Sequence, residues 1–122
     1  MTTPTHDDAM VMLRLMQLGS TPEMNRANEF VWGDDSVLDY KAFIKKYPVS
    51  SPQYTHVANV LGWYETLATL WKHKLFDETL LFDWIVVRRR WTRLEPFVRG
   101  VREETGEPRF WENFEALAAA EA

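Results

Sequence analysis

The segment PQYTHVANVLGWYETLATLWKHKL, residues 52–75, is the longest uninterrupted amphipathic pattern in the chain. Its apolar residues recur at steps of three and four, the spacing that places side chains on one face of an α-helix. One stripe consists of Val57, Leu61, Tyr64, Ala68, Trp71 and Leu75, and a second of Val60, Trp63, Leu67 and Leu70. The two stripes cover about half of a helical cylinder, so we predict a central helix that packs against two or more others.

Start and stop signals divide the chain before this segment into three shorter predicted helices. Thr5 and the Thr21-Pro22 pair are typical of helix starts, and Gly19 is typical of a stop. The predicted spans are 5–18, 22–32 and, beginning at Asp35 or Ser36, up to Tyr47. In the first span, Met10, Leu13 and Met16 form a stripe that we expect to pack on the core, although methionine also suits an adaptable contact surface.

Residues 77–105 carry the second long helical pattern. Its stripe consists of Leu80, Trp84, Val87, Trp91, Leu94, Val98 and Val101. Pro96 lacks the N–H that a helix interior needs, so we expect a bend or break near it. Gly106 ends the segment, and a final helix is predicted from Pro108 to about Ala120. The chain shows no strand pattern.

These patterns predict an all-α fold. We expect residues 1–122 to form a single-domain helical bundle of five to seven helices around two long central helices, which pack roughly antiparallel. The ends, 1–5 and 119–122, are expected to be mobile.

Composition narrows the class of protein. The chain has 122 residues, a formal net charge of −4 and no cysteine, which excludes disulfides, thiolate metal sites and a cysteine nucleophile. No signal peptide and no membrane span is evident, so we expect a soluble, cytoplasmic protein. The acidic balance argues against a dedicated nucleic-acid binder.

Two sets of residues are candidate contact sites. The half of the 77–105 segment before Val87 is apolar around its whole circumference, so it is either surrounded by the rest of the protein or presented to a partner. This candidate partner-binding set is Phe82, Ile85 and Val86, with Trp111. The basic run RRRWTR supplies candidate anion or nucleic-acid contacts, namely Arg88, Arg89, Arg90 and Arg93. On a helical wheel these arginines point in several directions, so intramolecular pairing or solvation is the simpler interpretation.

The sequence contains no recognisable motif for metal binding, phosphate binding or catalysis. His6, His56 and His73 lie far apart, none has a second histidine one turn away, and no Glu-x-x-His occurs, so no metal site is predicted. We find no phosphate loop and no catalytic serine motif, and no cofactor is expected. An enzyme would need an acid–base pair around Asp83, Glu65 and Arg102; we predict that the protein is not an enzyme.

Several segments resemble a family. NRANEFV, the run from Val57 to Ile85, and GEPRFWENFEALA occur in this order, and W-x-x-L-x-P lies before the last of them. Together they resemble a group of small helical bacterial proteins known only as a domain of unknown function. The resemblance covers roughly residues 20–118 and rests on Asn59, Leu75, Asp77, Trp91, Leu94, Pro96, Arg102, Pro108, Asn113, Phe114 and Glu115. It implies a fold and no catalytic residue.

The functional hypothesis that follows is a non-enzymatic helical protein–protein interaction module. The partner would be another protein or a second copy of the chain, giving a homodimer. The alternative is a nucleic-acid-binding or regulatory protein that uses the arginines between residues 88 and 93.

Overall fold

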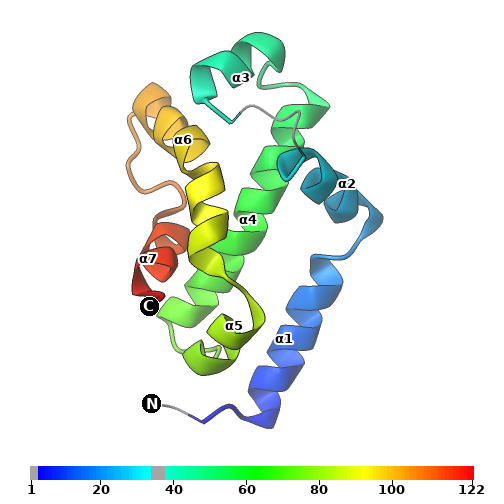
Figure 1. Cartoon of the computed structure of the whole chain (residues 1–122), viewed down its shortest axis with the longest axis vertical. Helices are drawn as coiled ribbons and strands as arrows, with labels where there is room; N and C mark the ends of the chain where they lie inside the picture. Colours follow the sequence, from blue (N-terminus) through cyan, green and yellow to red (C-terminus); the bar gives the residue numbers. More distant parts are fainter. Residues whose placement is uncertain (1–2, 34–37) are drawn as a thin grey trace.

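Helix α4, Pro52–Lys72, runs through the middle of the molecule, and the other helices are arranged around it (Figure 1). This computed structural model describes residues 3–33 and 38–122. In that part of the chain all regular structure is helical, which confirms the all-α prediction. The other helices are α1 (His6–Leu18), α2 (Pro22–Val31), α3 (Tyr40–Lys46), α5 (Glu78–Trp84), α6 (Val87–Thr105) and α7 (Glu112–Ala120).

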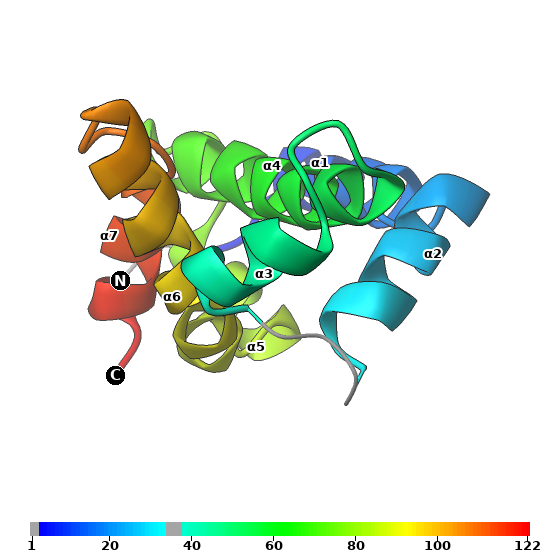
Figure 2. The ribbon, with the colours of Figure 1, turned by 90° about the horizontal axis from the view of Figure 1, so that it is seen from above.

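Helices α2 and α7 pack directly on α4, and α6 runs back beside it in the opposite direction (Figures 1 and 2). Aromatic side chains fill the space between them. Phe114 of α7 lies between Tyr64 of α4, at 4.9 Å between ring centroids, and Trp91 of α6, at 5.2 Å. Tyr54, near the start of α4, meets Phe97 at 5.5 Å. The predicted antiparallel pair of long helices is therefore present, with large rings as its contact layer.

The end of α4 differs from the prediction. The helix stops at Lys72 rather than Leu75, and Lys74 adopts the left-handed conformation with φ of 59°. The Leu75 N–H then donates to the Leu70 carbonyl at 2.9 Å, as in a helix-ending turn. The prediction that Leu75 packs on the core was wrong: it is 61% exposed, and Phe76 is buried instead.

Of the two alternatives expected near Pro96, a bend or a break, the break was wrong. The 77–105 segment is divided at Ile85 and Val86, whereas α6 continues through Pro96. Ile85, Val86 and Val87 are β-branched and therefore poor helix formers. Pro96 is exposed, so water reaches the solvent side of the helix where a carbonyl loses its partner.

The N-terminal end of α6, at Val87, is stabilised by a residue that is distant in the sequence. Val86 is its N-cap and supplies no side-chain bond. The carboxylate of Glu121 instead accepts from the Val87 N–H at 3.1 Å and from the Arg88 N–H at 2.8 Å. The C-terminal end, for which we expect mobility, is tied to α6 by these bonds.

The last helix begins later than predicted, at Glu112 rather than Pro108. Its N-cap, Trp111, is left-handed with φ of 58° and makes no side-chain bond. Glu65 of α4 replaces that cap by accepting from the Phe114 N–H at 2.9 Å. Helices α6 and α7, which begin without their own side-chain caps, are therefore held by carboxylates from distant parts of the chain.

Helix α3 is shorter at its start than predicted. Leu38 and Asp39 are not helical, and the Asp39 side chain accepts from the Ala42 N–H as the N-cap. The predicted start, Asp35 or Ser36, lies outside the described residues.

Candidate functional site

The candidate partner-binding set does not form one surface. Phe82 and Ile85 are half-buried and pack against the core, and only Val86 is largely exposed, at 60%. Trp111 is half-buried at the N-terminal end of α7, while Glu121 at the other end contacts the start of α6. A helix of this length rises roughly 13 Å, which separates Trp111 from Val86. Binding through these residues stays a prediction, now centred on Val86.

Two arginines of the basic cluster have structural roles. The guanidinium of Arg93 donates to the Val31 carbonyl at 3.1 Å and to the Gly33 carbonyl at 2.8 Å. Helix α2 has no basic residue in its own last turn, so Arg93 supplies the positive charge and the donors that its C-terminal end needs. Arg90 lies over the Trp32 ring at 4.9 Å, a cation–π contact.

Arg88 and Arg89 are exposed. Neither side chain makes an ion pair within the part of the chain that the structure describes. The four arginines thus point to different surroundings and do not line one groove. Nucleic-acid contact through them stays a prediction that would depend on Arg88 and Arg89.

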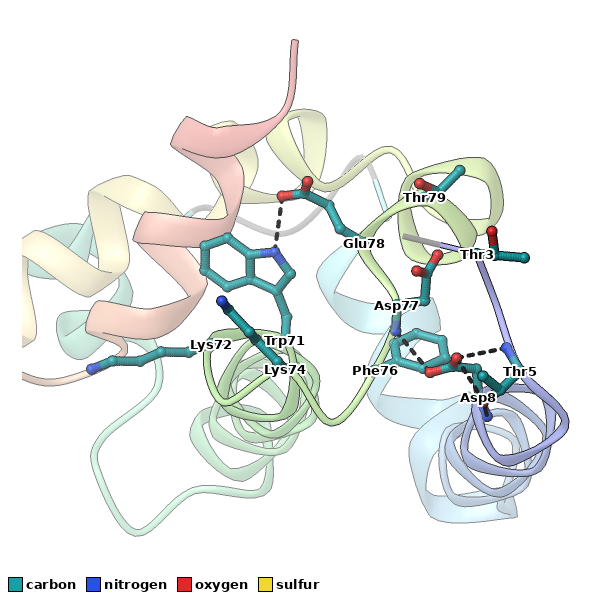
Figure 3. Close-up of a pocket in the computed structure, with 10 residues that line it drawn as sticks. All are labelled: Thr3, Thr5, Asp8, Trp71, Lys72, Lys74, Phe76, Asp77, Glu78 and Thr79. Atoms are coloured by element: carbon teal, nitrogen blue, oxygen red, sulfur yellow. Dashed lines mark hydrogen bonds between the residues drawn. The ribbon is translucent and has the colours of Figure 1, made fainter. Parts of the chain in front are cut away.

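A cleft of about 850 Å³ lies where the start of the chain meets the end of α4 (Figure 3). Figure 3 shows side chains from both segments on opposite sides, with residues 76–79 between them. The lining residues are Thr3, Thr5, Asp8, Trp71, Lys72, Lys74, Phe76, Asp77, Glu78 and Thr79. Three carboxylates and two lysines give the cleft mixed charge.

The carboxylates of this cleft already hold the fold together. Asp8 accepts from the Thr5 N–H at 2.8 Å and from the Asp77 N–H at 2.9 Å, and the Thr5 bond in particular lowers its pKa. Asp77 caps α5 through the Leu80 N–H at 2.9 Å. Glu78 accepts from the Trp71 indole at 3.1 Å. Each of the three carboxylates therefore takes part in a hydrogen bond that joins or caps segments of the fold.

Two of the three residues considered for acid–base chemistry, Glu65 and Arg102, also make structural bonds. Glu65 caps α7, and burial raises its pKa against the opposing effect of bonds from Phe114 and Asn113. Arg102 donates to the Phe110 carbonyl at 2.9 Å and to Glu115 at 2.8 Å. Asp83 is exposed.

The described residues contain neither a metal-binding group nor a membrane-spanning helix. Among residues 3–33 and 38–122, no group of three or more histidine, aspartate and glutamate side chains is placed to hold a metal ion. No helix of the described chain has both the length and the apolar character to cross a bilayer.

A second hollow lies between α3 and α6. Both banks carry mixed charge, with Asp39, Lys41 and Lys45 at α3 and Arg99, Glu103 and Glu104 on α6. Burial raises the pKa of the Tyr40 hydroxyl in this hollow, reinforced by the nearby Tyr54 and Glu104. Nothing in the described residues singles out a reactive group here.

The outer face of α1 is the surface that sequence reasoning placed wrongly. Its stripe was expected against the core, yet Met10 is 65% exposed, Leu13 47% and Met16 45%. The buried residue of α1 is Leu15, about half a turn away from this stripe around the helix. The methionine enrichment, which suits a contact surface, was the signal that pointed to this face.

Comparisons with known proteins agree with the resemblance described above over residues 20–118. The sequence model of a family described as a domain of unknown function, DUF4760, matches residues 4–120. No curated protein and no solved structure matches the chain. The chain therefore belongs to the DUF4760 family, a domain of unknown function.

Proposed function

We propose that this chain is a helical protein-interaction module and that its docking surface is the outer face of α1, formed by Met10, Leu13 and Met16. The exposure of these three neighbouring apolar side chains is the observation that carries the proposal. Clusters of exposed apolar side chains often mark contact sites in water-soluble proteins. Methionine and leucine adapt their shape to a partner surface.

The anchoring of α1 supports this proposal. The Trp63 indole donates to the Leu15 carbonyl at 3.0 Å, and Asp8 accepts from the Asp77 backbone. Both halves of α1 are therefore fastened through its inner side. The apolar outer face is a stable feature of a fixed helix, available to another molecule.

In this proposal the chain is non-enzymatic and works in the cytoplasm. The lack of cysteine is compatible with a reducing compartment. The structural use of Asp8, Asp77, Glu78 and Glu65 supports a binding role over a catalytic one.

Site-specific photocrosslinking tests the docking surface. A photoreactive phenylalanine analogue at position 13, introduced in cells of the source organism, should give a discrete adduct that mass spectrometry identifies. Adding Met10→Glu should remove the adduct, because a carboxylate resists transfer into an apolar contact. The matched control carries the analogue at Gly62, an exposed position on α4 with open space around it. Equal crosslinking at positions 13 and 62 would contradict the proposal.

A further inference from the structure

We propose that the partner of α1 is the α1 helix of a second copy of this chain, packed antiparallel. This inference rests on the proposed function and names its partner. His6, Met10, Leu13 and Gln17 recur at steps of four, three and four on the exposed face. That spacing is the seam of a two-stranded coiled coil.

The charged residues along one flank of this seam favour a second copy of the chain as the partner. Asp7 and Arg14 are seven residues apart and share that flank; both are exposed. Neither makes an ion pair within residues 3–33 and 38–122. In an antiparallel pair, Asp7 of each copy lies beside Arg14 of the other, so two opposite-charge contacts form. In a parallel pair Arg14 of one copy would instead lie beside Ala9 of the other, so neither opposite-charge contact would form.

On the opposite flank of the seam, the sizes of the side chains also fit an antiparallel pair. Ala9 and Met16, again seven residues apart, are both exposed there. Antiparallel packing sets the small Ala9 of one copy beside the long Met16 of the other. In the centre, Met10 of each copy meets Leu13 of its partner, and the polar His6 and Gln17 meet at the two ends. The face is thus complementary to itself in charge, size and polarity, as a two-fold contact requires.

The area of the exposed α1 face sets the expected affinity of the dimer. One helix of 13 residues covers less area than the roughly 800 Å² per partner of a standard interface. We therefore expect a reversible dimer with a dissociation constant on the order of 0.1 mM.

Sedimentation equilibrium of the whole chain from about 10 μM to 1 mM tests the arrangement. Asp7→Arg and Arg14→Asp should each weaken the dimer about tenfold or more, because each creates two like-charge contacts. The double charge swap should restore the wild-type constant. Arg26→Asp, an exposed charge reversal on α2, is the matched control and should leave the constant unchanged. Circular dichroism checks that every variant keeps its helix content.

Each outcome decides one of the two proposals. A chain that stays monomeric at 1 mM overturns the second-copy inference, as does a double swap that fails to restore association. If the photocrosslinked adduct at position 13 then contains a different protein, the proposed function stands without self-association. If no specific adduct forms at position 13, the proposed function fails as well.

Discussion

Gly100 of α6 lies directly against the side chain of Tyr40 on α3, so that a β-carbon at position 100 would overlap the Cβ and Cγ of Tyr40. Tyr40 also meets the Phe97 ring at 5.5 Å, one turn earlier on α6. The missing side chain of Gly100 therefore permits the close approach of these two helices.

Gly100→Ala should lower the free energy of unfolding by about 1–3 kcal/mol, because Tyr40 or the backbone must move to make room. Gly62→Ala is the matched control, since nothing lies within 4 Å of its added β-carbon. Alanine in an open helix interior should raise stability by about 0.5–1 kcal/mol. Urea denaturation measures both. Equal effects of the two substitutions would refute the packing role of Gly100.

Arg93→Ala should destabilise the fold by about 1–3 kcal/mol, because the carbonyls at the end of α2 lose a charged donor. Arg89→Ala removes an exposed arginine of the same cluster and should change stability by less than about 0.5 kcal/mol. Thermal and urea unfolding of the Arg93→Ala and Arg89→Ala variants measure the two changes in stability. A similar loss in both variants would mean that the Arg93 contacts do not stabilise α2.

Glu65→Gln should change how stability depends on pH. Burial raises the pKa of Glu65 in the native state, so the native state binds this proton more tightly than the unfolded chain. The stabilising contribution is therefore full below the unfolded pKa of about 4.3 and is lost as pH rises through the higher native pKa. The stability of the wild type relative to Glu65→Gln should fall as pH increases over that window.

Glu112→Gln should change the pH dependence of stability in the opposite direction to Glu65→Gln. The bond from Arg109 lowers the pKa of Glu112 in the native state. Its contribution is present above the unfolded pKa and is lost as pH falls through the lower native pKa. Urea titrations between about pH 3 and pH 7 should give slopes of opposite sign for the two variants, and slopes of one sign would contradict this account.

Trp63→Phe should loosen α1, because phenylalanine cannot donate to the Leu15 carbonyl and no longer fills the contact with Gly19. Hydrogen exchange of the α1 amides should become faster, with a loss of about 1–3 kcal/mol in unfolding free energy. Trp71→Phe also removes an indole bond, to Glu78, and should leave exchange in α1 unchanged. Unaltered exchange in the Trp63 variant would show that α1 is held by other contacts.

The sequence by itself determined the helical class and those helix starts whose caps lie beside them. Thr5, Thr21, Ser51 and Asp77 each accept a backbone bond from the residue three positions on, as their sequence contexts indicate. The left-handed Gly106 ends α6 for an equally local reason. Neighbouring residues suffice to fix such features.

Only the tertiary structure decided where α6 and α7 begin and which face of α1 turns outward. Glu121 caps α6 and Glu65 caps α7 from more than thirty residues away, so no local pattern marks either start. In α1, apolar residues occur on both faces, and the contacts of Leu15 with distant parts of the chain select the buried one. Helix starts with a cap beside them could therefore be predicted from local sequence, whereas the starts of α6 and α7 and the exposed face of α1 depended on contacts with distant parts of the chain.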